Sequence, residues 1–177
     1  MIKYVIENES VILVSGGTGI SPTLSLVRHF LRNGGASSDK FKMKNIYLSW
    51  SSHELDSFLI LEELLDEIVE TGTNGIIKIF LHITGDYGIR KLKVENIYPN
   101  LAKHSPKFVK IIPDRHNVYS LIEAVVKENP GNTYGIAAIG SRSLTRQARR
   151  TTNYWNKSNT FEKRINYYEG QLFFLEL

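Results

Sequence analysis

The segment from residue 11 to residue 22, VILVSGGTGISP, holds the residues of this chain best suited to binding chemistry. An apolar, partly β-branched run stops at a glycine pair, which is typical of a buried parallel strand ending in a tight turn. Ser21 is suited to cap the helix that follows, and Pro22 to occupy its first position. Free backbone amides and the helix dipole at that point favour a phosphate. We therefore expect the pyrophosphate of a dinucleotide to bind here.

The glycine spacing in this segment is a weak signal by itself. It reads GxGxxP from Gly17 to Pro22, which also fits an ordinary strand-to-helix turn. No GxxxxGK followed by Ser or Thr occurs, so ATP or GTP chemistry of the P-loop type is not expected. The candidate pyrophosphate loop consists of Gly16, Gly17, Thr18, Gly19, Ile20 and Pro22.

Three polar residues follow the second expected strand, where the ribose of a dinucleotide lies in such folds. They are Ser51, Ser52 and His53, and the first acid, Glu54, comes one position later. Without an acid to hold a ribose 2′-OH, these groups favour a 2′-phosphate, and we expect NADPH rather than NADH. The alternative is that Ser52 only caps the turn leading to Leu55.

A second glycine loop, residues 140–143, follows the fifth expected strand and opens a helix rich in arginine. Ile139, Gly140, Ser141 and Arg142 are candidate cofactor-binding residues there. Arginines recur on one helical face at three- and four-residue spacing, at positions 142, 146, 149 and 150. Arg142 or Arg146 could bind a phosphate through its forked guanidinium. The alternatives are a solvated basic face, or a surface for an acidic protein or lipid.

Composition narrows the class of protein. The chain has 177 residues, 42% of them hydrophobic, which suits one globular domain. It contains no cysteine, and its five histidines form no HExxH pattern, so we expect no metal centre. The net charge of +4 would suit nucleic acid, but basic and acidic residues are interleaved and no RNA-binding motif appears. We therefore expect no nucleic-acid partner.

Strand and helix patterns alternate along the chain, which predicts an α/β fold. Strands are expected at 10–14, 46–50, 76–84, 109–112, 134–139 and 165–168, and helices at 23–33, 55–69, 118–128 and 144 to about 155. Residues 85–107 lack periodicity and are expected to form a surface insertion. The predicted fold of residues 1–177 is a three-layer, Rossmann-like parallel sheet with helices on both faces.

These segments resemble the nicotinamide-dinucleotide half of the ferredoxin–NADP reductase superfamily. LVSGGTGISP followed by YLSWSSHELDSFLILEELL looks most like the C-terminal domain of fungal ferric reductases and NADPH oxidases. Residues 115–118, RHNV, stand where that family has Arg-Pro-Asp and a hydrophobic residue, which makes Arg115 a candidate ligand contact. The alternative is that Asp114 and Arg115 only form a turn and helix cap. Residues 139–141, IGS, stand where it has Cys-Gly-Pro. Residues 171–173, QLF, stand loosely where it has Glu-x-Phe. Phe173 or Phe174 could therefore stack on the nicotinamide or flavin, and the alternative is that this aromatic tail packs at the edge of the sheet.

The resemblance implies a role and a setting. The domain would bind NADPH and present it to FAD on a neighbouring flavin domain. The flavin would pass electrons to haem in a membrane domain and so to ferric iron or oxygen. No general acid or base is assigned, since hydride transfer to flavin does not require one. The chain would be the C-terminal part of a longer membrane reductase, lying on the cytosolic face.

Departures from the family pattern leave other functions open. Ile139 replaces a cysteine that lies near the nicotinamide in the family, and no flavin-binding Arg-x-x-Ser/Thr motif is visible. A degenerate, non-catalytic nucleotide-binding domain used for regulation is the main alternative. A different Rossmann enzyme such as a methyltransferase is another, although the acid expected after its second strand is not evident.

Overall fold

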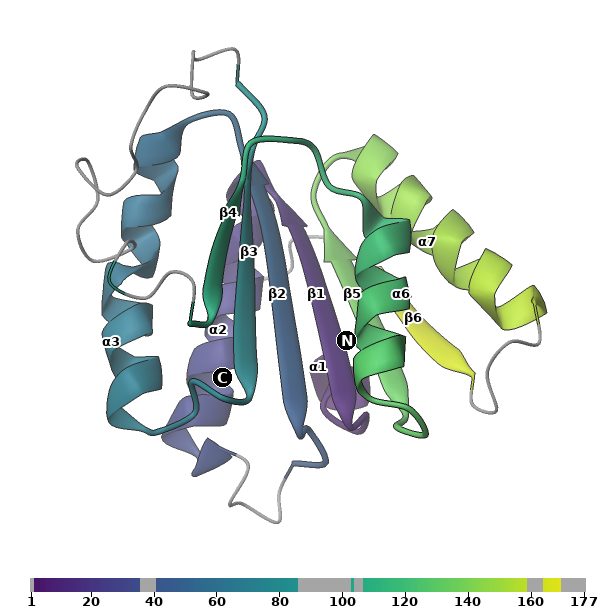
Figure 1. Cartoon of the computed structure of the whole chain (residues 1–177), viewed down its shortest axis with the longest axis horizontal. Helices are drawn as coiled ribbons and strands as arrows, with labels where there is room; N and C mark the ends of the chain where they lie inside the picture. Colours follow the sequence, from purple (N-terminus) through teal and green to yellow (C-terminus); the bar gives the residue numbers. More distant parts are fainter. Residues whose placement is uncertain (1, 36–40, 86–102, 104–106, 159–163, 170–177) are drawn as a thin grey trace.

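A six-stranded, wholly parallel sheet organises the chain (Figure 1). The computed structural model describes residues 2–35, 41–85, 103, 107–158 and 164–169. The strands are β1 (Ser10–Gly16), β2 (Asn45–Ser52), β3 (Ile77–Ile83), β4 (Val109–Ile112), β5 (Tyr134–Ile139) and β6 (Ile165–Glu169). The predicted Rossmann-like fold class is confirmed.

Helices cover both faces of this sheet. They are α1 (Ile2–Val5), α2 (Ile20–Arg32), α3 (Glu62–Glu70), α6 (Val118–Glu128) and α7 (Arg142–Lys157). The 3₁₀ segments η1 (Gly17–Gly19) and η3 (Leu55–Leu61) precede α2 and α3. Figure 1 shows α2 behind the sheet and α6 in front of it.

The alternation of side chains along β1 builds two separate cores. Val11 and Leu13 pack into a cluster with α2 and α3, whereas Ile12 and Val14 pack into a cluster with α6 and α7. Because a central parallel strand is buried on both faces, every one of these positions is apolar. This explains why the run before the glycines contains no polar alternation.

The strand order β4-β3-β2-β1-β5-β6 determines where a ligand can bind. The chain first builds outward from β1 to β4 and then returns to place β5 on the other side of β1. The loops after β1 and β5 therefore diverge to opposite faces at the carboxyl edge of the sheet. Such a switch point is where open α/β sheets bind their ligands.

The start of α2 differs from the prediction. The helix begins at Ile20 with Gly19 at its N-cap, and no side chain caps it. Ser21 and Pro22 are thus the second and third helical residues, and their assignment as cap and first residue was wrong. Proline is tolerated there because the first N–H groups of a helix have no intrahelical acceptor.

The predicted single helix at 55–69 is in fact two elements, η3 followed by α3. The apolar residues Leu55, Phe58 and Leu61 recur every three positions, the period of a 3₁₀ helix. Within this predicted helix, the apolar residues Leu59 and Val69 are 44% and 45% exposed. The tighter turn rotates Leu59 away from the core, and Val69 lies in the last turn of α3.

Other boundaries agree closely with the sequence patterns. The bounds of β4, α6 and β5 match, β1 continues two residues further than expected, and α7 begins two residues earlier. The short helix α1 was not predicted. The expected insertion at 85–107 lies almost entirely outside the described residues, and so does the chain after residue 169.

The two glycine loops touch each other through their backbones. A Cβ added at Gly19 would lie 2.5 Å from the carbonyl oxygen of Ile139, and one added at Gly140 would lie 3.0 Å from the amide nitrogen of Gly16. Gly19 has a helical φ of −62°, so its turn would accept any residue. The need for glycine at this position therefore comes from packing between loops.

We expect Gly19→Ala to lower the free energy of unfolding by about 1–3 kcal/mol, the usual cost of overpacking. The added carbon meets backbone, which cannot rotate aside. Gly75→Ala is the matched control, because nothing lies within 4 Å of a Cβ there. Chemical denaturation measures both variants, and equal stabilities would contradict the packing argument.

Candidate functional site

An open cleft with a volume of about 1500 Å³ lies at the switch point. It is lined by the loop after β1, the end of β2, the segment before α6, and the loop and helix after β5. Its lining residues are Gly16, Gly17, Thr18, Gly19, Ser51, Ser52, His53, Thr84, Arg115, His116, Ile139, Gly140, Ser141, Arg142, Ser143, Leu144, Thr145, Arg146, Gln147, Arg149, Arg150 and Glu169.

Buried polar groups fix the glycine loop after β1 from two sides. The hydroxyls of Ser15 and Thr23 are 2.6 Å apart and tie the end of β1 to α2. The indole N–H of Trp50 donates to the carbonyl of Gly17 at 3.0 Å. Gly17 itself has a φ of 53°, and a Cβ there would meet nothing within 4 Å. The loop is therefore held firmly while the backbone of Gly17 stays open to the cleft.

The wall formed by the end of β2 carries hydroxyl and imidazole groups. The Ser52 hydroxyl donates to Ser57 and accepts from the Glu54 amide, so it is engaged in the local turn. The segment η3 has Glu54 at its N-cap and no side-chain cap hydrogen bond. The exposed His53 contacts the Thr84 hydroxyl through Nδ1 at 3.1 Å. Ser51 is half-buried and lines the cleft, and no hydrogen bond of its hydroxyl is recorded among the described residues.

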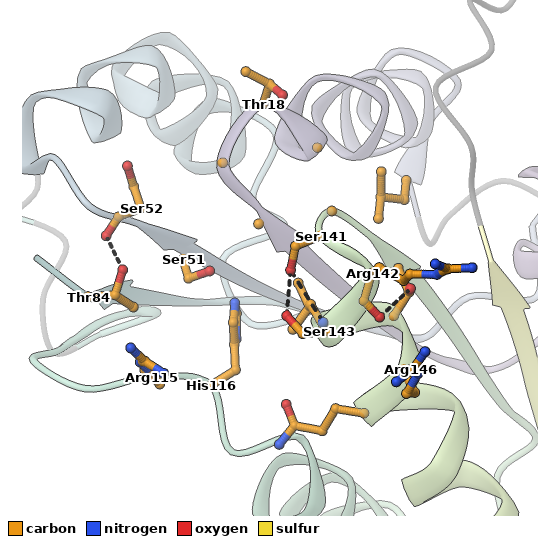
Figure 2. A pocket seen from close by; sticks show the side chains of 18 of the residues that line it. Thr18, Ser51, Ser52, Thr84, Arg115, His116, Ser141, Arg142, Ser143 and Arg146 are labelled. Carbon is orange, nitrogen blue, oxygen red and sulfur yellow. Dashed lines mark hydrogen bonds between the residues drawn. The ribbon is translucent and has the colours of Figure 1, made fainter.

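Five arginines make the cleft strongly cationic. Arg149 pairs with Glu169 at 2.5 Å. Within the described residues, Arg115, Arg142, Arg146 and Arg150 form no salt bridge. In Figure 2, Arg115 lies on the side of Ser51 and Thr84, whereas Arg142 and Arg146 lie beyond Ser141 on the other side. The cleft therefore offers positive charge at both ends of an extended anion.

The structure brings together most of the predicted site residues. Those lining the cleft are Gly16, Gly17, Thr18, Gly19, Ser51, Ser52, His53, Arg115, Ile139, Gly140, Ser141 and Arg142. Ile20 is not among the lining residues, and its side chain packs in the core with α2 and α3. Pro22 is also outside the lining, and Phe173 lies outside the described residues. That these residues bind a nucleotide stays a prediction.

His116 and Thr84 are lining residues that the sequence analysis did not select. His116 lies 3.0 Å from the Ser15 carbonyl through Nε2 and 2.8 Å from the Ser49 hydroxyl through Nδ1. Burial, and next the nearby His82, lower its pKa to about 4. In the sequence, the only indication that His116 belongs to the site is that it directly follows Arg115, a candidate ligand contact. Its partners on β1 and β2 are far away along the chain, so no local pattern indicates them.

Comparison with known proteins identifies the family. Residues 8–153 match the ferric reductase NAD-binding domain. The chain belongs to this family. It is therefore an NAD-binding domain of the ferric reductase and NADPH oxidase type, as the motifs indicated.

Individual relatives of this NAD-binding domain are distant. NADPH oxidase 4 of Homo sapiens is 23% identical over 158 residues, which cover 87% of this chain and 25% of that protein. A superoxide-generating NADPH oxidase heavy chain of Dictyostelium discoideum is 24% identical over 160 residues, which cover 85% of this chain and 22% of that protein. The chain thus spans about a quarter of the length of these relatives. The finer expectation of a fungal type stays a prediction.

The described part of this NAD-binding domain has no helix that is both long and apolar enough to cross a bilayer.

The free energy of unfolding should fall as the pH is lowered from about 7 to about 4. The pKa of His116 is about 4 in the folded protein and 6.5 ordinarily, so the unfolded chain takes up a proton first. The full effect from His116 would be on the order of 3 kcal/mol. His116→Phe should make this pH dependence shallower in denaturation curves. His29→Phe, a change at an exposed histidine of α2, should not, and equal slopes in both variants would contradict the assignment.

Proposed function

We propose that this domain binds NADPH and presents its nicotinamide to FAD held by a separate domain. The observation that supports this most strongly is a fixed glycine loop at the switch point, facing a cleft with four arginines that lack a salt bridge among the described residues. NADPH is an extended molecule whose phosphate groups carry several negative charges. Its shape and its charge both suit such a cleft.

The residues fit this ligand in three places. Gly17, Thr18 and Gly19 would receive the pyrophosphate, because the Gly17 backbone is open and held by Trp50. Ser51 and His53 would face the adenosine ribose and its 2′-phosphate. The nicotinamide would lie near the backbone of Ile139 and Gly140, with Arg142 and Ser141 at the start of α7 closing that end.

The protein would contribute binding and orientation, while NADPH supplies the hydride chemistry. The rigid contact between the two glycine loops would keep the part of the cleft that receives the nicotinamide at a constant distance from the part that receives the pyrophosphate. No side chain is proposed to move a proton.

The wider role is also a proposal. The relatives are named as NADPH oxidases, one of them superoxide-generating. We propose that the parent protein carries flavin and haem domains, that it acts at the cytosolic face of a membrane, and that electrons pass to ferric iron or oxygen. No nucleic acid is proposed as a partner.

A regulatory nucleotide-binding domain is the second candidate. The observation that favours it is Ile139, which stands where the ferric reductase and NADPH oxidase family has a cysteine. Ile139 is 4% exposed. Such a domain would bind NADPH in the same cleft without transferring hydride.

We expect the chain to bind NADPH more tightly than NADH, by about 10- to 150-fold, the value of a hydrogen bond to a charged group. Arg142→Ala should weaken the binding of NADPH and of NADH to the same extent, because Arg142 would contact groups that both nucleotides have. Arg32→Ala, at the exposed end of α2, is the control and should change neither. Calorimetry with both nucleotides measures the ratio, and equal or reversed affinity would refute the NADPH assignment.

The 177-residue chain alone should not reduce ferric chelates or oxygen with NADPH. NADPH gives up two electrons together, whereas these acceptors would take one at a time, so a flavin must mediate. Adding the parent's flavin domain should produce NADPH-dependent dye reduction. Robust activity without added flavin would show that the chain is a complete enzyme, and nucleotide binding without activity in the complex would favour the regulatory role.

A further inference from the structure

The hydrogen bonds of His116 determine which of its nitrogens carries the proton. Its Nε2 faces the Ser15 carbonyl at 3.0 Å, and a carbonyl can only accept, so Nε2–H donates. In the neutral ring Nδ1 is then an acceptor, and the Ser49 hydroxyl donates to it at 2.8 Å. The ring thus satisfies polar groups of both β1 and β2 at once.

A second histidine binds the same segment to a third strand. His82 of β3 contacts the Asp114 carbonyl through Nδ1 at 3.1 Å, so this nitrogen donates. The rings of His82 and His116 are 4.4 Å apart between their centroids. The segment from Asp114 to His116 is therefore attached to three neighbouring strands at the carboxyl edge of the sheet.

Arg115 lies between these two attachment points. Its backbone N–H donates to the Asp114 carboxylate at 2.6 Å, while its side chain is exposed and lines the cleft. His82 is paired in register with Ser51 of β2. The segment therefore holds Arg115 on the same side of the cleft as Ser51, as Figure 2 shows. This is the side proposed for the ribose.

We propose that His116 is a positioning residue that holds Arg115 at the 2′-phosphate end of the cleft and so determines the preference for NADPH over NADH. This inference rests on the proposed nucleotide-binding function. It assigns specificity to a residue that need not touch the nucleotide.

The surroundings of His116 keep it in the required neutral form. Its contacts on β1 and β2, Ser15 and Ser49, are uncharged. Its titratable or charged neighbours include His82 of β3, with ring centroids 4.4 Å apart, and Asp114 and Arg115 just before it in the chain. Because burial and His82 lower the pKa of His116 to about 4, the ring remains neutral near pH 7 and Nδ1 remains able to accept from Ser49.

The test compares nucleotide preference in single and double variants of the whole chain. Arg115→Ala should lower NADPH affinity by about 10- to 150-fold with little change for NADH. His116→Phe keeps a ring but removes both hydrogen bonds, and should lower NADPH affinity by at least about fivefold, again with little change for NADH. The double variant should bind NADPH no more weakly than Arg115→Ala alone. His29→Phe is the matched control.

The outcomes separate this inference from the proposed function. If the unmodified chain shows no preference for NADPH, both are overturned. If it prefers NADPH but His116→Phe weakens both nucleotides equally, or adds fully to Arg115→Ala, His116 is only structural and this inference alone fails. Should His116→Phe not fold by circular dichroism, Ser49→Ala removes only the hydroxyl that donates to Nδ1 and gives the same comparison.

Discussion

The contact between two backbone segments, at Gly19 and at Ile139–Gly140, is the constraint on which the site depends. These segments come from loops on opposite sides of the sheet, and the Gly19 position leaves 2.5 Å between a would-be Cβ and the Ile139 carbonyl oxygen. At this separation no side chain fits between them. The two loops consequently form one continuous floor, and the walls of the cleft rise from it on the β2 side and the α7 side.

Hydrogen bonds between polar groups beneath and beside this floor keep the loops in place. The Ser15 and Thr23 hydroxyls bond each other, the Trp50 indole bonds Gly17, and His116 bonds Ser15 and Ser49. Each bond satisfies a group that would be costly to bury alone. The arginines, by contrast, lie on the exposed walls. The groups that fix the loops and the groups that carry the positive charge are thus different residues.

The sequence predicted the elements best where the spacing of apolar residues along the chain matches the set of residues buried in the core. The bounds of α6 and β5 followed from their apolar spacing, and the glycine loops indicated the switch point before the strand order was known. The start of α2 was misplaced because proline fits any position of a first turn. The 3₁₀ segment was missed because a three-residue period resembles an amphipathic helix over short stretches. His116 could not be recognised, since its partners Ser15, Ser49 and His82 meet it only when β1, β2 and β3 are side by side.

The position of β5 also matters while the chain is being made. β1 pairs with β2 on one side and with β5 on the other, and β5 ends at residue 139. Until that residue emerges from the ribosome, β1 would be an open edge strand, and its run Val11–Val14 is apolar on both faces. Such an edge invites pairing with other chains. The strand that completes the cleft is therefore also the one that covers an aggregation-prone edge of the nascent protein.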